Sequence, residues 1–143
     1  MSNNLEQLER DRPICVSVII CNEIIEDKRT SNKTLVSLFN GIGVQSLPII
    51  HPRMFIMASL TNGIGTWPVT FVVKSPSDVE LVRIKNDMAF RDPLIVEDIW
   101  VELQGLPLKE EGVYFVDVLV GNYPMGNRRF TVRLMKPAPP SGS

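Results

Sequence analysis

The sequence contains few of the residues from which catalytic and metal sites are usually built. His51 is the only histidine, and Cys15 and Cys21 are the only cysteines among 143 residues. One histidine without a Cys-x-x-Cys pair does not supply the ligands of a zinc site. Neither Asn-Gly-Ile-Gly segment, at residues 40–43 and 62–65, is followed by the Lys-Ser or Lys-Thr of a phosphate-binding loop. We therefore expect a protein that is not an enzyme and holds no cofactor or metal.

The lone histidine and the two cysteines are expected to be structural. As a general base, His51 would need a nucleophile and an orienting carboxylate, so we expect a loop histidine. Cys15 and Cys21 lie six residues apart in a segment that we interpret as extended, about 20 Å from each other on one face. A disulfide needs Cα atoms within roughly 7 Å, so we expect two buried thiols that act as small hydrophobes.

Neither sign of charge is in clear excess, since 15 basic residues balance 16 acidic ones. Proteins that bind nucleic acid usually have a marked basic excess, so we do not expect a nucleic-acid partner. Residues 1–12 lack the basic start and the apolar stretch of a signal peptide. No segment reaches the roughly 18 uninterrupted apolar residues of a membrane span. We expect a cytoplasmic protein with no membrane partner.

Apolar residues recur with a period of two, which is typical of strands. In residues 128–135, for example, Phe130, Val132 and Leu134 alternate with Arg129, Thr131 and Arg133. About eight segments follow this pattern, most of them five to eight residues long and separated by turns. They are residues 14–21, 34–39, 54–61, 67–74, 79–85, 94–103, 113–120 and 128–135.

This pattern predicts an all-β fold. No stretch is long enough for the helix that joins parallel strands, so a parallel α/β sheet is not expected. Many short strands with regular turns favour an antiparallel β-sandwich of about eight strands, either immunoglobulin-like or jelly-roll-like. We predict this domain over residues 13–135. A polar segment, residues 1–12, precedes it, and a flexible Pro/Ser/Gly tail, residues 136–143, follows it.

Two features refine the predicted strands. Asn62-Gly63 lies between the apolar segments 54–61 and 67–74, which predicts a β-hairpin at this pair. The segment 79–85 changes phase, from Val79 and Leu81 to Val82 and Ile84, which indicates a β-bulge. Asn40-Gly41-Ile42-Gly43 is interpreted as a break after the second strand, because asparagine and glycine tolerate positive φ.

Two stretches of the chain carry a resemblance to a known family. One contains Ile19-Ile20-Cys21-Asn22 and continues through Ile24, Asp27 and Thr30 to Leu35 and Phe39, and the other contains Leu103-Gln104-Gly105-Leu106 and then Gly112-Val113-Tyr114. Over roughly residues 13 to 135 the chain resembles an uncharacterised bacterial family of single-domain proteins, a family of unknown function. The resemblance implies a compact β-sandwich and supplies no catalytic residue and no substrate.

Two basic clusters are candidate partner-binding residues. Lys28, Arg29 and Lys33 lie in one predicted turn, and Arg128, Arg129 and Arg133 lie at the last predicted strand. On an edge strand, Arg129 and Arg133 would form a solvent-facing basic stripe that protects against aggregation. An acidic protein partner and a polynucleotide are the alternatives to this structural role.

The leading functional hypothesis is a non-enzymatic structural or protein-interaction module, acting as a homo-oligomer or inside a larger assembly. The alternative is a β-sandwich that binds a small ligand or a carbohydrate. In that case Trp67, Trp100 and Tyr123 would supply stacking surfaces, although packing in a core is the commoner role of such residues. An enzyme would require His51 to meet a carboxylate or a thiol in a pocket.

Overall fold

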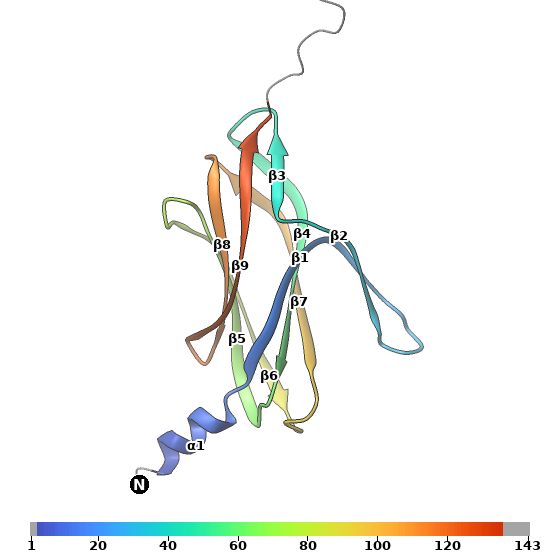
Figure 1. Ribbon diagram of the computed structural model, residues 1–143, viewed down its shortest axis with the longest axis vertical. Helices are drawn as coiled ribbons and strands as arrows, with labels where there is room; N and C mark the ends of the chain where they lie inside the picture. The colour runs from blue at the N-terminus through green and yellow to red at the C-terminus, as the bar shows by residue number, and fades with distance from the viewer. Residues whose placement is uncertain (1–2, 136–143) are drawn as a thin grey trace, which may run out of the picture.

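Two β-sheets face each other in the computed structural model, which describes residues 3–135 (Figure 1). The elements are α1 (Asn3–Asp11), β1 (Ile14–Glu26), β2 (Lys33–Leu38), β3 (Gly41–Val44), β4 (Ile49–Thr61), β5 (Gly65–Lys74), β6 (Glu80–Phe90), β7 (Glu97–Leu108), β8 (Gly112–Val120) and β9 (Tyr123–Leu134). One sheet has the strand order β2-β1-β4-β7 and the other the order β3-β9-β8-β5-β6. The predicted all-β sandwich is confirmed, with nine strands.

The core consists of the inward-facing side chains of both sheets. On β8, Val116, Val118 and Val120 are fully buried, and they belong to the same apolar cluster as Ile56 of β4 and Val101 of β7. Burying such a side chain contributes about 1.5–3 kcal/mol relative to leaving it exposed. The two-residue period of the sequence therefore reflects a real division of each strand into an inner and an outer face.

The strand order is that of an immunoglobulin domain. β1, β4 and β7 occupy the places of strands A, B and E, and β9, β8 and β5 those of strands G, F and C. β3 pairs with β9 in parallel. The prediction of a wholly antiparallel sandwich is therefore wrong at this one pair. β2 has no counterpart in this plan, because it is an additional strand beside β1 at the edge of its sheet.

Two buried aromatic residues occupy positions typical of the immunoglobulin fold. Trp67 lies on β5, in the place of strand C, and is only 9% exposed. Tyr114 lies near the start of β8, in the place of strand F, and its hydroxyl donates a hydrogen bond of 2.7 Å to the carbonyl oxygen of Glu110. Its ring stacks on Phe130 with 5.1 Å between centroids. This arrangement is the tyrosine corner of the fold.

The predicted hairpin at Asn62-Gly63 is wrong. These residues connect β4 in one sheet with β5 in the other, so the chain crosses the sandwich at this point. Asn62 still adopts a positive φ of 63°, as the turn interpretation required. A Cβ atom at Gly63 would lie 2.5 Å from Pro13, so only glycine allows this close approach. Local turn chemistry is the same in a hairpin and in a crossing.

Three predicted boundaries also change. The stretch interpreted as a break at Gly41 is β3, which pairs with the end of β9. β4 begins at Ile49, so His51 lies within a strand and not in a loop. β7 begins at Glu97, because the residues before it form a turn in which the Asp92 carboxylate accepts the Leu94 N–H at 2.9 Å. β3 and the first residues of β4 were missed because they pair with strands distant in the sequence, β9 and β7.

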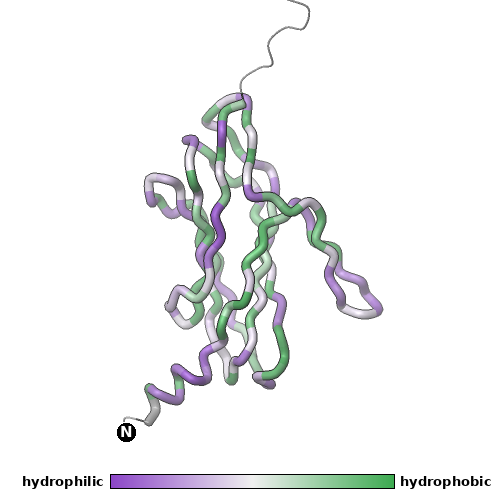
Figure 2. Tube along the Cα trace, in the orientation of Figure 1, coloured by the Kyte–Doolittle hydropathy of each residue, from purple (hydrophilic) through white to green (hydrophobic). Residues whose placement is uncertain are grey.

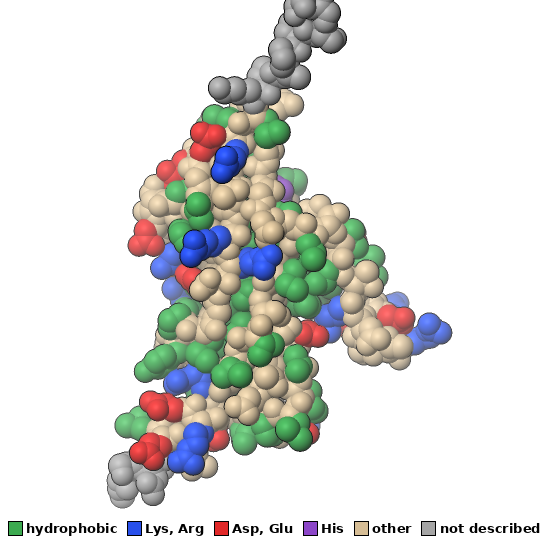
Figure 3. All heavy atoms as spheres, in the orientation of Figure 1, with side chains coloured by type: hydrophobic (Ala, Val, Ile, Leu, Met, Phe, Trp, Pro, Cys, Tyr) green, Lys and Arg blue, Asp and Glu red, His purple; other side chains and the backbone are tan. Residues whose placement is uncertain are grey.

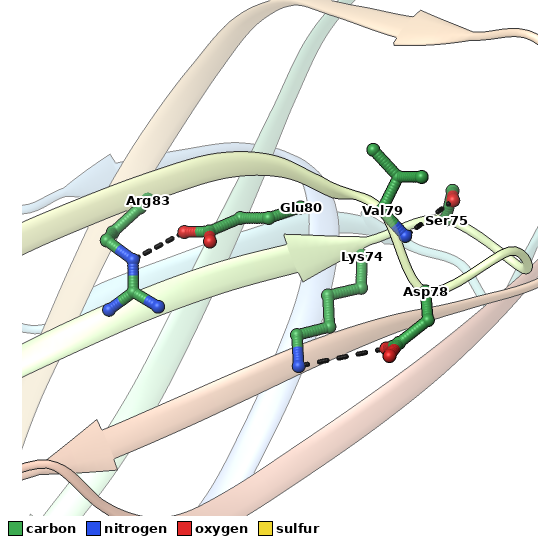
Figure 4. Close-up of polar contacts among 6 residues, drawn as sticks. All are labelled: Lys74, Ser75, Asp78, Val79, Glu80 and Arg83. Atoms are coloured by element: carbon green, nitrogen blue, oxygen red, sulfur yellow. Dashed lines mark hydrogen bonds and ion pairs between the residues drawn. The ribbon is translucent and has the colours of Figure 1, made fainter.

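The bulge predicted in β6 is present. The pairing of β5 with β6 shifts between Val73 and Lys74, which leaves Leu81 as an extra residue. The hairpin turn itself is fixed locally, since Ser75 Oγ accepts the Val79 N–H at 3.1 Å and the Lys74 ammonium lies 3.8 Å from the Asp78 carboxylate (Figure 4). The phase change in the sequence was therefore a reliable signal of the bulge.

A second bulge changes the placement of the cysteines. The pairing of β1 with β4 shifts between Cys15 and Ser17, so Cys15 turns inward beside Val18 and Gly126. Cys21 pairs with Phe55 on the outer face of its sheet and is fully buried there. The prediction that the two thiols share one face is wrong. Both cysteines are free, and burial raises the pKa of each thiol, which lowers its reactivity.

The segment predicted only as polar contains a helix. α1 has two apolar residues, Leu5 and Leu8, and both are exposed, so this short polar helix buries no apolar stripe against the sandwich. The Ile64 N–H donates a hydrogen bond of 2.9 Å to the Asp11 carbonyl oxygen, which fixes the end of α1 to the sandwich. α1 is too short and too polar to cross a membrane.

The predicted tail, residues 136–143, lies outside the described residues.

The tyrosine corner gives a prediction of stability. In Tyr114→Phe the ring contacts remain, but the carbonyl oxygen of Glu110 loses its donor. We expect the free energy of unfolding to fall by about 1–3 kcal/mol, measured by urea denaturation. Tyr123→Phe is the matched control, since Tyr123 is 54% exposed, and its effect should be close to zero. Equal losses in the two variants would contradict a specific role of the Tyr114 hydroxyl.

Candidate interaction surface

β1 and β2 continue beyond the sandwich as a two-stranded arm, residues 22–38 (Figure 1). The strands pair from Cys21 opposite Leu38 to Glu26 opposite Lys33. The turn at the tip is closed by hydrogen bonds, in which the Asp27 N–H donates to the Asn32 carbonyl oxygen at 2.8 Å and the Asp27 carboxylate accepts the Arg29 N–H at 2.8 Å. The arm is therefore an ordered hairpin without support from the core.

The arm presents apolar side chains that the core does not bury. Leu38 is 60% and Ile25 50% exposed, while Ile24, Leu35 and Val36 are half-buried, and none of the five belongs to the core cluster. Figure 2 shows a hydrophobic base and a hydrophilic tip, and Figure 3 shows apolar side chains along the base. Clustered exposed apolar side chains are a common mark of a protein interface.

The first basic cluster is gathered at the tip of this arm. Lys28 and Arg29 lie in the turn and Lys33 begins β2. Arg29 lies 3.8 Å from the Asp27 carboxylate, a contact between exposed groups that contributes little. Lys28 and Lys33 form no ion pair within residues 3–135, and the three cations outnumber the two carboxylates of the tip, Glu26 and Asp27, by one.

The second basic cluster does not form one surface. β9 lies between β3 and β8, and β3 covers its edge from Thr131 to Leu134, so Arg133 does not lie on a free edge. Arg128 and Arg129 are consecutive and face opposite sides of the sheet. Arg128 donates hydrogen bonds of 3.1 and 2.7 Å to the Asn40 side-chain oxygen, which fixes the turn before β3.

Arg129 and Arg133 stay on the outer face of the five-stranded sheet. The guanidinium of Arg129 lies 5.9 Å from the ring centroid of Phe115, and both arginines are exposed. These residues lie on the opposite sheet from the arm, so the six predicted basic residues do not make one binding surface (Figure 3). Only the cluster at Lys28, Arg29 and Lys33 remains together.

The three candidate stacking residues are also separated. Trp67 and Tyr123 flank Arg12, whose guanidinium lies 5.4 Å from the first ring centroid and 4.1 Å from the second. The indole N–H of Trp67 donates a hydrogen bond of 2.8 Å to the Ile64 carbonyl oxygen. Trp67, Arg12 and Tyr123 together hold the N-terminal segment against the sandwich. Trp100 lies on the other sheet, 5.8 Å from Phe55, and is 39% exposed. Trp100 therefore does not share a surface with Trp67 and Tyr123.

His51 lies at the base of the arm beside a cavity of about 200 Å³. Its ring lies 6.2 Å from Phe39, and its buried Nε2 has no hydrogen-bond partner among the described residues. Burial lowers the pKa of His51 and favours the neutral ring. No carboxylate or thiol belongs to the described lining, which consists of Asn22, Ser37, Leu38, Phe39, Gly41, Ile42 and His51. This environment does not provide the partners of a general base.

An apolar groove follows the open side of the sandwich, where the edges of β6 and β7 face each other. A cavity of about 240 Å³ lies between the strands, and its apolar lining consists of Val82, Ile84, Leu103 and Leu106. A second cavity, about 360 Å³, lies near Tyr114, where the Glu110 carboxylate accepts the Ser77 hydroxyl at 2.6 Å. Both edge strands leave backbone groups unpaired on the side of this groove.

Residues 3–135 contain no group of three or more His, Cys, Asp or Glu side chains that could hold a metal ion. The two cavities on the open side of the sandwich are lined mainly by apolar groups. The features that stand out chemically are therefore an apolar arm with a basic tip and an apolar groove between two free edges.

Comparisons with known proteins give a family and a number of distant structural likenesses, two of which follow. The model of the "Family of unknown function (DUF6941)" matches residues 16–133. No curated protein matches the sequence. The chain is similar in structure to the Pseudomonas fluorescens alkylpurine DNA glycosylase AlkC bound to DNA containing an abasic site analog, with 13% identity and a TM-score of 0.48 over 66% of this chain. It spans only 27% of the glycosylase chain.

The second structural likeness is to an immunoglobulin-like protein (PA1606) from Pseudomonas aeruginosa. The identity is 12% and the TM-score 0.38, with 82% of this chain and 98% of that chain covered. At these values neither likeness gives information on function. The arm and the groove therefore have to be interpreted from their own residues.

The neutral state of His51 gives a prediction for the pH dependence of stability. Its pKa in the folded protein lies below the unfolded value of about 6.5, so the unfolded chain binds more protons as the pH falls. The free energy of unfolding should therefore decrease from about pH 7.5 to about pH 5.5. In His51→Gln this decrease should be smaller, as measured by urea denaturation at both pH values.

The chain has no other histidine, and the carboxylates are common to both proteins, so the difference between the two slopes isolates His51. Identical slopes for the parent and His51→Gln would show that His51 titrates as in the unfolded chain.

Proposed function

The chain belongs to a family of unknown function, DUF6941, and we propose that it is a non-enzymatic protein-interaction module whose β1–β2 arm is the docking element. The observation that carries this proposal is the position of β2. This strand lies outside the immunoglobulin plan, in which β1, β4 and β7 belong to one sheet and β5, β8 and β9 to the other. Functional elements are commonly added to a scaffold in this way.

The chemistry of the arm suits a protein partner. β2 is an edge strand, so its outward backbone groups can pair with an added strand. Leu38 and Ile25 offer apolar surface, and Lys28 at the tip offers positive charge. Such a surface favours a partner that provides a strand edge, apolar side chains and carboxylates.

The proposal of a non-enzymatic role is supported by the surroundings of the reactive groups. The described residues around the His51 cavity include no carboxylate or thiol, and the two thiols have raised pKa values. Unpaired cysteines also support the proposal that the module works in the cytoplasm, where thiols stay reduced. The arm would then attach this chain, as a subunit, to a larger assembly.

A photo-crosslinking amino acid tests the arm as a docking element. We expect a benzoylphenylalanine in place of Leu38 to give a covalent adduct with another protein chain in the native host, because Leu38 is the most exposed apolar residue of the arm. The same probe in place of Phe115 is the control, since this residue is 37% exposed and lies on the other sheet.

Adduct formation is read by denaturing electrophoresis and mass spectrometry, with circular dichroism to confirm the fold of each variant. An adduct at Leu38 and none at Phe115 supports the proposal. Equal adducts at both positions, or none at Leu38 in a folded protein, would overturn it.

A further inference from the structure

We propose that the partner of the arm is a second copy of this chain, with β2 of one copy adding to β7 of the next. This inference rests on the proposed role of the arm as the docking element. β2 and β7 are the two outer strands of the same four-stranded sheet. Their pairing would therefore join the sheets of successive copies into one continuous sheet.

The strand directions allow this pairing without a rotation of the second copy. Each neighbouring pair in the sheet, β2 with β1, β1 with β4 and β4 with β7, is antiparallel. β2 and β7 therefore run in opposite directions. A copy placed in the same orientation at the edge brings its β2 antiparallel to β7, which is the more stable arrangement of two strands.

The outer faces of the two strands offer one apolar contact, at Trp100, which Asp98 and Glu102 flank on β7. On β2, Leu38 pairs with Cys21 and Val36 with Glu23, and Cys21 faces away from the core. On β7, Trp100 pairs with Met57 on the same outer face of the sheet and remains 39% exposed. Antiparallel addition places Val36 and Leu38 of one copy beside Trp100 of the other. Aromatic and aliphatic neighbours across strands stabilise such pairs.

On the inner face of the joined sheet, the groove between β6 and β7 provides a place for Leu35 of the added β2. Leu35 is on the opposite side of β2 from Leu38 and Val36, so it would face the groove between β6 and β7. The cavity of about 240 Å³ in this groove lies beside β7, and its lining includes Val82, Ile84, Leu103 and Leu106 together with the polar Glu102 and Gln104. An added β2 thus contributes apolar side chains to both faces of the joined sheet.

β7 is the most acidic of the sheet edges. β7 contains Glu97, Asp98 and Glu102 and no basic residue, whereas β2 contains Lys33 and no acidic residue. The other long edge, β6, carries Arg83 and Lys85 in its centre, balanced by Glu80 and Asp87, so it offers no net negative charge to Lys33. Complementary charge of this kind guides encounter and excludes wrong pairings.

The geometry predicts growth beyond a dimer. Each copy would use a different strand on its two sides, so the contact is heterologous and builds a chain or a closed ring. Pairing is limited to the first part of β7, because Pro107 has no N–H and Gly105 adopts a positive φ of 75°. β2 is six residues long, which fits the remaining part.

Complementary charge variants test the proposed contact on the full chain. Leu38→Asp places an uncompensated charge on β2, and Trp100→Lys places one on β7, so each alone should weaken self-association about tenfold or more. In an equimolar mixture, an assembly in which the two variants alternate has only Asp–Lys and the original Leu–Trp junctions, so association should return. Sedimentation velocity over a range of concentrations measures the sizes.

Val113→Asp and Phe115→Lys are the matched controls, because both residues are partly exposed on the other sheet, and association should be unchanged in them. A parent chain that stays monomeric up to millimolar concentration would overturn the inference. So would a limiting dimer that is sensitive to Leu38→Asp but not to Trp100→Lys, since this is the result for two β2 edges paired with each other. Failure of the equimolar mixture to associate would also overturn it.

The crosslink from position 38 separates the two proposals. An adduct of the chain with itself, mapped to the peptide that contains Trp100, supports both. An adduct with a different protein leaves the arm as a docking element and overturns the second copy as its partner. Absence of any adduct at position 38 in a folded protein overturns both.

Discussion

The structure depends on the requirement that each sheet bury one apolar face against the other. The inner residues of β4, β5 and β8 are almost fully buried, and the core they form determines how much of each neighbouring strand can be covered. β1 is 13 residues long, and only its first part lies over this core. The rest of β1 needs a partner for its backbone, which β2 provides. The arm is thus a consequence of a strand longer than its sandwich.

The sequence predicted the elements with their own local signal and failed where pairing decides the structure. Alternation identified strands such as β8 and β9, and a phase change identified the bulge at Leu81. β3 was missed, because a short Gly-Ile-Gly-Val segment becomes a strand only beside β9. Asn62-Gly63 was misinterpreted, because the chemistry of a turn does not tell whether the strands around it lie in one sheet or in two.

The candidate surface was predicted only in part for a similar reason. Lys28, Arg29 and Lys33 were recognisable as a group, because a short turn keeps its residues together. Leu38 was not recognised, since alternation looks the same in a strand that covers the core and in one that extends past it. Arg128 and Arg129 looked like neighbours in sequence, but a strand points consecutive side chains to opposite faces.

The four sheet edges differ in how they are protected, and this difference carries the argument for the arm. β6 has Arg83 and Lys85 on its length, and β3 is only four residues long. The second part of β7 is blocked by Pro107. β2 has one lysine at its start and then only Thr, Leu, Val and Ser residues. Edges without protection are a hazard of aggregation in natural proteins. The edges left open are β2 and the first part of β7, which is best explained by their use in a specific contact.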